Sequence, residues 1–306
     1  MKRLAAIWLL MLAALAAAWE GEPIPADIAR DYLEADTVLD EARCDWRETV
    51  GSIFRPAVAG CRSAEEATLY IASHMTELTA VYYSTARRKA NMNALEALAE
   101  KKVSCTGQSV LLVCALRSVG IPARAVCVPT WNHVPGNHTW AEAWVNGEWR
   151  MIEFNEKSFN TPWVMESIGL LNPQRPEQRI YAAAPTTGKL IRYGRNPIQV
   201  EDVTERYTRL AQQWYAHADL PAGHKRLMVD VQPRPARPII LILEAEDGRQ
   251  LATAPSPTEQ DDMRQFAAFN LPADGQYYLR VQGQEHRDPV RTTSQPALVM
   301  RLVKGD

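Results

Sequence analysis

The stretch KKVSCTGQSVLLVCALRSVGIPAR, residues 101–124, predicts a buried helix with a cysteine in its first turn. Apolar residues dominate positions 110–116, so this helix has little polar surface and we expect it to be central to the fold. Gly120 is the residue type that most often follows a helix C-terminus, and Pro122 prevents the helix from continuing. These signals predict a helix over residues 105–118.

Cys105 is the first residue of this predicted helix, and its position favours a reactive thiol. The unpaired backbone N–H groups and the dipole at a helix N-terminus stabilise negative charge, which lowers the pKa of a thiol placed there. Cys114 follows nine residues later and, at about 100° per residue, faces roughly the opposite side of the helix. Cys105 is therefore a candidate nucleophile or a small core residue, whereas Cys114 is a core or disulfide residue.

A second stretch, HTWAEAWVNGEWRMIEF at residues 138–154, predicts a β-hairpin. Asn146-Gly147 is a preferred two-residue turn, and the strands on both sides alternate in polarity. Paired residues of a hairpin share a face, and alternate residues return to it. Counting outward from the turn therefore places His138 on the same face as Glu153 and Asn155.

These residues could complete the machinery that a thiolate nucleophile needs. A nucleophile of this kind requires a base, and the base requires a partner that orients it. His138 is the candidate base, and Glu153, or failing that Asn155, could fix the imidazole tautomer. The pattern fits a catalytic triad of Cys105, His138 and Glu153, with His133 in the preceding loop as a competing base.

Composition excludes several other functions. The 306 residues are 46% hydrophobic and 23% charged, which is typical of a globular protein. Thirty-four basic and 36 acidic residues give a formal charge of −2, and no basic stripe indicates nucleic-acid binding. The sequence has no C-x-x-C pair and no Cys/His cluster with zinc spacing, so neither a metal nor an organic cofactor is implied.

The N-terminus has the pattern of a secretory signal peptide. A basic start, an apolar run and small residues at an A-x-A position predict cleavage near Trp19, and the run is shorter than the roughly 20 residues that span a bilayer. We therefore expect a secreted or periplasmic protein without stable membrane insertion after cleavage. Such compartments favour disulfides. The five cysteines leave two pairings open, Cys44 with Cys61 and Cys114 with Cys127.

Four segments follow from these patterns. Residues 1–18 are the signal peptide, and residues 19–104 form a helical N-terminal region in which Ser63 and Asn93 begin helices. Residues 105–224 contain the core and an extension read as helix and loop. Residues 225–306 contain short strands divided by Gly, Pro and Asp, which predict a β-sandwich module.

The two quoted motifs resemble the transglutaminase-like superfamily. The relevant stretches are SCTGQSVLLVCALRSVGIPARAV, residues 104–126, and GNHTWAEAWVNGEWRMIEF, residues 136–154. The resemblance implies an α+β fold with a papain-like transglutaminase core, and it assigns Cys105 and His138 the roles of nucleophile and base. The family has an Asp where this chain has Glu153. Exported bacterial proteins of this kind often carry an appended β domain.

The resemblance implies thiol-dependent acyl chemistry on amide or peptide bonds, with a peptide, protein or glycopeptide as substrate. Hydrolysis by a cysteine peptidase or amidase is favoured over transglutamination. The change from Asp to Glu153 leaves open a weak or inactive protein that binds peptide or glycan. An amidase that acts on glycosylated asparagine is a third possibility, because peptide N-glycanases share the superfamily core.

Overall fold

The computed structural model describes residues 19, 23–132, 136–193, 196–217, 221, 223–259, 266–291 and 297–303. The predicted signal peptide, residues 1–18, and the competing base His133 lie outside these residues. No helix among the described residues is long and apolar enough to cross a membrane. The chain divides into two compact units, unit 1 with Met1–Thr161 and Asn172–Glu205, and unit 2 with Pro162–Leu171 and Arg206–Asp306.

Helices make up most of the N-terminal part of unit 1, as the sequence predicted. They are α2 (Ala26–Tyr32), α3 (Arg47–Ala57), α4 (Ala64–Ser73), α5 (Met75–Thr79) and α6 (Ala94–Glu100). The predicted helix starts are present: the Ser63 hydroxyl caps α4 by accepting from the Glu66 backbone N–H, and Asn93 and Glu96 form a reciprocal capping box at α6. A short parallel pair, β1 (Tyr82–Tyr83) and β2 (Lys102–Val103), leads into the next helix.

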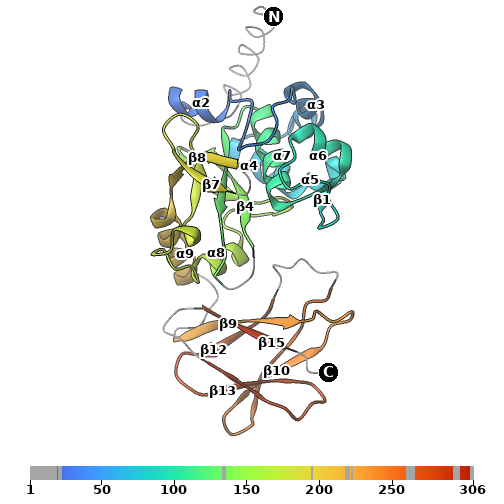
Figure 1. Ribbon diagram of the computed structural model, residues 1–306, viewed down its shortest axis with the longest axis vertical. Coiled ribbons are helices and arrows are strands. Elements are labelled where there is room, and N and C mark those ends of the chain that lie inside the picture. The colour runs from blue at the N-terminus through green and yellow to red at the C-terminus, as the bar shows by residue number, and fades with distance from the viewer. Residues whose placement is uncertain are drawn as a thin grey trace, which may run out of the picture. The chain divides into compact units, whose positions relative to one another are not determined.

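The central helix α7 (Cys105–Ser118) has the predicted bounds. Every residue after Cys105 is buried, and α7 packs against α3, α4 and α6 and against the sheet. Figure 1 shows these helices grouped together, with the sheet strands beside them. The helix ends in a Schellman motif, in which the Gly120 N–H bonds the Arg117 carbonyl and the Ile121 N–H bonds the Leu116 carbonyl. Gly120 has a φ of 87°, a conformation that a residue without Cβ adopts at no steric cost.

A six-stranded antiparallel sheet lies against α7. Its order is β5-β4-β3-β6-β8-β7. The strands are β3 (Ala123–Val128), β4 (His138–Val145), β5 (Glu148–Ile152), β6 (Tyr181–Ala183), β7 (Lys189–Tyr193) and β8 (Asn196–Asp202). This mixture of helices and an antiparallel sheet confirms the predicted α+β class.

The β4–β5 hairpin has the predicted register near its turn. Trp144 pairs with Trp149, and Asn146 and Gly147 both have positive φ, as the primed turn requires. The paired ladder ends where Ala141 meets Ile152, so the expected pairing does not continue to residues 153 and 155. The position of Glu153 is therefore set by the chain that leaves the strand.

Three strands occur where the sequence indicated helix and loop. Residues 164–224 do contain two helices, α8 (Pro162–Ile168) and α9 (Thr204–His217), but β6, β7 and β8 lie between them and extend the sheet. Their local pattern is weak because β7, which reads KLIRY, exposes Lys189, Leu190 and Arg192 and fully buries only its last residue, Tyr193. Pairing with neighbouring strands forms these elements, and local hydrophobic alternation does not reveal it.

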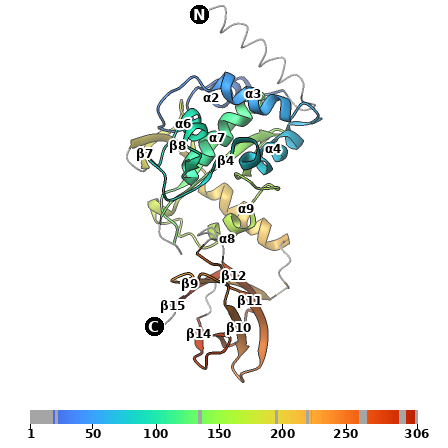
Figure 2. The same cartoon turned by 90° about the vertical axis from the view of Figure 1, so that its right-hand side faces the viewer.

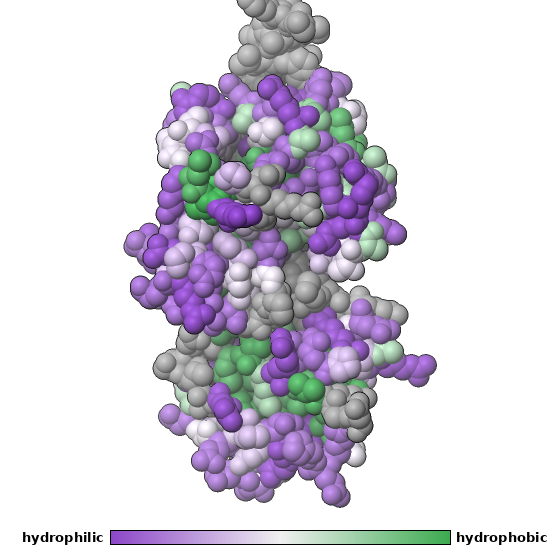
Figure 3. Space-filling model, in the orientation of Figure 1, coloured by the Kyte–Doolittle hydropathy of each residue, from purple (hydrophilic) through white to green (hydrophobic). Residues whose placement is uncertain are grey.

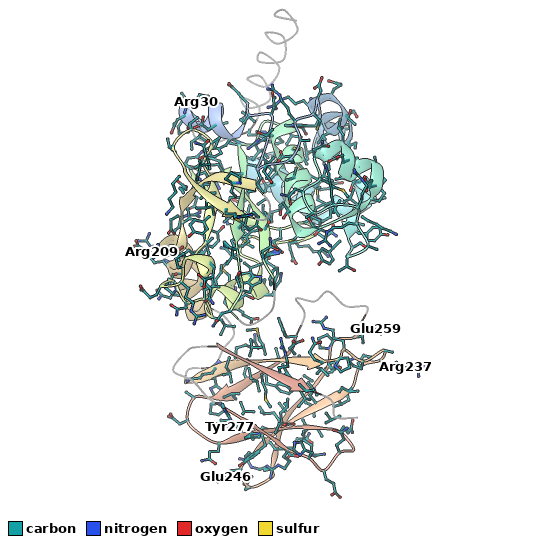
Figure 4. All side chains as sticks on the ribbon, in the orientation of Figure 1. Arg30, Arg209, Arg237, Glu246, Glu259 and Tyr277 are labelled. Atoms are coloured by element: carbon teal, nitrogen blue, oxygen red, sulfur yellow. The ribbon has the colours of Figure 1, made fainter. Side chains whose placement is uncertain are left out.

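Unit 2 contains the predicted β-sandwich. One sheet has the order β11-β10-β13-β14 and the other β12-β9-β15, and residues from both sheets form one hydrophobic core. Tyr277, labelled in Figure 4, belongs to this core. The strands, which are labelled in Figure 1 or Figure 2, are β9 (His224–Gln232), β10 (Ile240–Ala245), β11 (Gln250–Pro255), β12 (Ala267–Pro272), β13 (Tyr277–Val281), β14 (Asp288–Val290) and β15 (Ala297–Val303).

The segment that contains α8 packs on the sandwich. Leu170 contacts Met228 of β9, on the face opposite the sandwich core, and Glu166 forms an ion pair with Arg226 at 3.1 Å. Figure 3 shows apolar surface on unit 2 between hydrophilic patches, and Ile240 and Val303 are among its exposed apolar side chains. Unit 2 therefore combines the C-terminal strands with a short segment from earlier in the chain.

The structure contains neither of the two disulfides that the sequence left open. Cys44 and Cys61 are half-buried free thiols, and Cys114 and Cys127 are buried free thiols. Burial raises the pKa of both Cys114 and Cys127 well above the ordinary value for a thiol. Of the two roles predicted for Cys114, core residue or disulfide partner, the structure therefore supports the core residue.

Candidate active site

Cys105 begins α7 and is half-buried, unlike the rest of the helix. The Ser104 hydroxyl caps the helix by accepting from the Gly107 N–H at 3.0 Å, which holds the first turn in place. The Ser109 hydroxyl lies 2.9 Å from the Cys105 carbonyl. A Cβ added at Gly107 would lie 2.9 Å from Val103 Cβ, so this turn needs a glycine to pack against β2.

His138 begins β4 and is brought between Cys105 and Glu153. Its imidazole is buried and its Nε2 is hydrogen-bonded to Glu153 Oε1. The Cys105 thiol group also hydrogen-bonds the imidazole. Because Glu153 engages Nε2, Nδ1 is the ring nitrogen that remains for the thiol. The longer side chain of Glu153, compared with an Asp, thus reaches the ring from beyond the end of β5.

The environment of His138 favours its protonated form. Burial lowers the pKa of His138, but the Glu153 carboxylate and the hydrogen bonds to Cys105 and Glu153 outweigh burial and raise the pKa to about 9. A cationic imidazolium next to a thiol favours the thiolate. The geometry therefore suits an ion pair between a Cys105 thiolate and a His138 imidazolium.

Asn155, the alternative partner for His138, points elsewhere. Its side-chain amide bonds the Thr76 backbone N–H and hydroxyl at 3.0 and 2.7 Å, and its backbone N–H bonds the Ala72 carbonyl. Its φ of 64° turns the chain away from the direction of β5. The extrapolated hairpin register is therefore wrong at this position, because the strand ends at Ile152.

Two tryptophans lie beside the imidazole. The rings of Trp131 and Trp140 have centroids 6.2 and 5.7 Å from that of the His138 ring and are inclined to it by 26° and 25°. Trp140 is buried. Trp131 was not identified from the sequence. The sequence feature that could have identified Trp131 is its place directly before the loop that leads to His138.

A chain of hydroxyl groups lies next to the site. The Tyr193 hydroxyl is 2.6 Å from Thr139 Oγ1, and Thr139 Oγ1 is 2.9 Å from Thr106 Oγ1. Thr106 follows Cys105, and Thr139 follows His138. Sequence reasoning missed all three residues. Tyr193 was missed because β7 was not predicted, whereas Thr106 and Thr139 lie in predicted elements but carried no signal of their own.

Other motif residues hold the frame of the site. The buried Arg124 guanidinium bonds Glu142 at 2.9 Å and Glu201 at 2.6 Å, and it lies over the Trp149 ring. The buried Arg117 donates to three backbone carbonyls, those of Ala35, Thr37 and Ala123. These arginines therefore join α7, the sheet and the N-terminal segment.

Among the described residues, no group of three or more His, Cys, Asp or Glu side chains lies close enough together to hold a metal ion. The His138 imidazole, which bonds the Glu153 carboxylate, also hydrogen-bonds Cys105, and the next residue, Thr106, belongs to the chain of hydroxyl groups. The site thus offers a thiol, a base and an orienting acid, which together suit nucleophilic chemistry at a carbonyl carbon.

Comparison with known families matches residues 52–154 to the transglutaminase-like superfamily. The match confirms the core expected from the sequence motifs, and it begins further upstream than those motifs. It includes Cys105, His138 and Glu153. No curated protein sequence matches the chain.

Three solved structures are similar to parts of the chain. A protein from Cytophaga hutchinsonii, provisionally described as a cysteine protease, has a TM-score of 0.37 and 18% identity over 45% of this chain and 46% of its own. Red sea bream transglutaminase has a TM-score of 0.38 and 11% identity over 91% and 64%. The Bacillus anthracis TIE protein has a TM-score of 0.21 and 10% identity over 41% and 24%. The chain spans less than two thirds of the length of each.

Proposed function

Because residues 52–154 form a transglutaminase-like superfamily domain, we propose that the protein is a cysteine enzyme that acts on amide or peptide bonds. One observation carries the proposal: the buried His138 imidazole is hydrogen-bonded both to Glu153 and to Cys105. In this arrangement Cys105 is the nucleophile, His138 the base and Glu153 the residue that orients the imidazole.

The reaction begins when the Cys105 thiolate attacks the substrate carbonyl carbon and the carbonyl oxygen takes the negative charge. His138 donates its proton to the leaving amine, the C–N bond breaks, and an acyl thioester remains on Cys105. Water then attacks the thioester, His138 takes a proton from it, and the carboxylic acid leaves. The Cys105 backbone N–H is one candidate donor to the oxyanion, and loss of such a donor typically costs about 3–4 kcal/mol.

Hydrolysis is the favoured outcome, with a peptide, protein or glycopeptide as substrate. Export to the periplasm or the medium remains a prediction that depends on residues 1–18. Peptides and asparagine-linked glycopeptides, supplied with and without a primary amine, distinguish the three reactions. Release of free acid indicates hydrolysis, capture of the amine indicates transglutamination, and loss of the glycan indicates a glycoamidase.

Site-resolved alkylation tests the proposal before any substrate is known. Iodoacetamide labelling of the mature protein between pH 4 and 9, read by mass spectrometry, gives the rate at Cys105 in wild type and in His138→Ala. We expect rapid labelling at mildly acidic pH that is lost or shifted upward in the variant. Cys44 and Cys61 serve as internal references, because burial raises the pKa of each and both should react only at higher pH.

His74→Ala is the matched control. His74 lies between α4 and α5, where Nδ1 bonds the Tyr70 carbonyl at 2.8 Å, so its loss should leave Cys105 labelling unchanged. Labelling of Cys105 only above about pH 8, where an unperturbed thiol titrates, and with no dependence on His138, would instead support a non-enzymatic binding protein.

A further inference from the structure

We propose that Tyr193 is a positioning residue whose hydroxyl, through Thr139 and Thr106, holds the first turn of α7 against the start of β4. The residues held in this way are the neighbours of Cys105 and His138. That this positioning serves catalysis rests on the proposed function. The structural role, which is to fix where the thiol lies relative to the imidazole, does not depend on it.

Tyr193 is buried and its hydroxyl has three polar neighbours on or next to β4. They are Thr139 Oγ1 at 2.6 Å, Asn137 Nδ2 at 2.8 Å and the His138 carbonyl at 3.2 Å. The phenol therefore contacts three consecutive residues, with His138 at the centre. Burial also raises the pKa of Tyr193 well above its ordinary value, so the hydroxyl keeps its proton and can donate it.

Thr139 carries the connection from β4 to α7. Its Oγ1 is 2.9 Å from Thr106 Oγ1, and its carbonyl accepts from the Ser109 hydroxyl at 2.8 Å. The same Ser109 hydroxyl lies 2.9 Å from the Cys105 carbonyl. The helix turn that presents the thiol is thus joined to β4 at two points, one turn apart.

Two donor orders satisfy these hydroxyls, and in both the Asn137 amide donates to Tyr193. Either Tyr193 donates to Thr139 and Thr139 to Thr106, or Tyr193 donates to the His138 carbonyl, Thr139 to Tyr193 and Thr106 to Thr139. Buried polar groups with complete partners rigidify their surroundings, whereas a buried hydroxyl that loses its partner is destabilising. The chain therefore favours a single placement of α7 relative to β4.

The contact between Tyr193 and β4 also shows that the sheet curls. Three strands separate β7 from β4 in the sheet order, and four steps of about 4.8 Å would put them roughly 19 Å apart in a flat sheet. A tyrosine side chain cannot span that distance. The sheet must therefore bring the end of β7 back towards the start of β4, where the site lies.

The titration of His138 reports the positioning directly. The ionisable groups that face the imidazole are Cys105 from α7 and Glu153 from the chain after β5. Proton-dependent ¹⁵N shifts of labelled histidine give its midpoint in wild type, Tyr193→Phe and Thr139→Val, and His138→Ala assigns the signal. Tyr181→Phe is the control, because Tyr181 belongs to the same buried cluster as Tyr193 but its hydroxyl bonds the Pro176 carbonyl.

We expect both hydroxyl-deleting variants to lower the His138 midpoint by about one pH unit, which is a tenfold change in the ratio of protonated to neutral imidazole at a given pH. Thr139→Ser, which keeps a hydroxyl, should restore the wild-type midpoint, and Tyr181→Phe should leave it unchanged. Cys105 alkylation at pH 6 should slow in parallel with the midpoint.

An unchanged midpoint in folded Tyr193→Phe and Thr139→Val would overturn the proposal, as would an equal shift in Tyr181→Phe. The proposed function fails by a different result, namely wild-type alkylation of Cys105 that does not depend on His138. In that case the midpoint comparison still decides whether Tyr193 positions the pair.

Discussion

Replacing Glu153 by Gln removes the negative charge next to His138 while keeping an oxygen that can accept from Nε2. The Glu153 carboxylate is the largest influence that raises the pKa of His138, and it acts against burial, which lowers the pKa. Without the charge, burial is opposed mainly by the hydrogen bond to Cys105. We therefore expect the pKa of His138 to fall from about 9 to near 6.5 or below.

The size of the effect follows from these two values. A fall of about 2.5 pKa units corresponds to about 3 kcal/mol of lost preference for the imidazolium. At pH 7.5 the ratio of protonated to neutral His138 changes from about 30:1 to about 1:10, a decrease of roughly 300-fold. The thiolate of Cys105 loses its cationic partner in the same proportion, so its alkylation below pH 7 should become slow.

Two measurements on the same samples test this expectation. Histidine ¹⁵N shifts between pH 4.5 and 10.5 give the midpoint of His138, and iodoacetamide labelling at pH 6 gives the rate at Cys105. Glu153→Asp keeps the charge but shortens the side chain by one methylene, so its midpoint should lie between those of wild type and Glu153→Gln. Glu148→Gln removes a carboxylate from the exposed first residue of β5, the strand that precedes Glu153, and should match wild type.

A His138 midpoint that stays near 9 in Glu153→Gln would refute the expected influence of the Glu153 charge on the pKa of His138. Such a result would mean that Cys105 or another group holds the proton on the imidazole. A His138 midpoint that falls while Cys105 labelling at pH 6 remains fast would mean that Glu153 sets the pKa of His138 but that the charge on His138 does not control the reactivity of the thiol.

Three further predictions concern stability, measured by urea unfolding. The pKa of His138 is higher in the folded state, so protonation of His138 adds up to about 3 kcal/mol to the free energy of unfolding. This contribution is complete below pH 6.5 and is lost as the pH rises through about 9. The stability difference between wild type and His138→Ala should therefore shrink over that range. Gly107→Ala places a Cβ 2.9 Å from Val103 Cβ and should cost about 1–3 kcal/mol, and a neutral result would show that β2 can move. Arg124→Met removes the guanidinium that lies 2.9 Å from the buried Glu142 carboxylate and should cost about 3–5 kcal/mol, whereas a loss below 1 kcal/mol would mean that the pair adds little.

Local signals predicted the parts of the site that local geometry controls. The apolar run and Gly120 define α7, and the Asn-Gly turn defines the hairpin and its first pairs. Glu153 was identified by counting alternate residues, although the strand ends one residue earlier. Its side chain is long enough to reach His138 in spite of this.

Features that depend on contacts between distant parts of the chain could not be predicted from local sequence patterns. The strands β6, β7 and β8 form by pairing with partners that are distant in sequence, and β7 buries only one residue fully. Tyr193 was therefore missed together with its strand. The suggested disulfides failed for a related reason, since the distance between two thiols depends on the packing of whole helices and strands.

The motif and the site are consequently different sets of residues. Arg117 and Arg124 are part of the recognisable pattern, yet their contacts are backbone carbonyls and buried carboxylates, so they support the fold whether or not the protein is active. Tyr193 lies outside the matched residues 52–154, yet its hydroxyl is bonded to Thr139 and to the His138 carbonyl. A chain could thus keep every motif residue and lose the alignment of Cys105 with its base through a change in β7. Whether a protein of this type is active should therefore be judged from the residues that hold the pair, as well as from the pair itself.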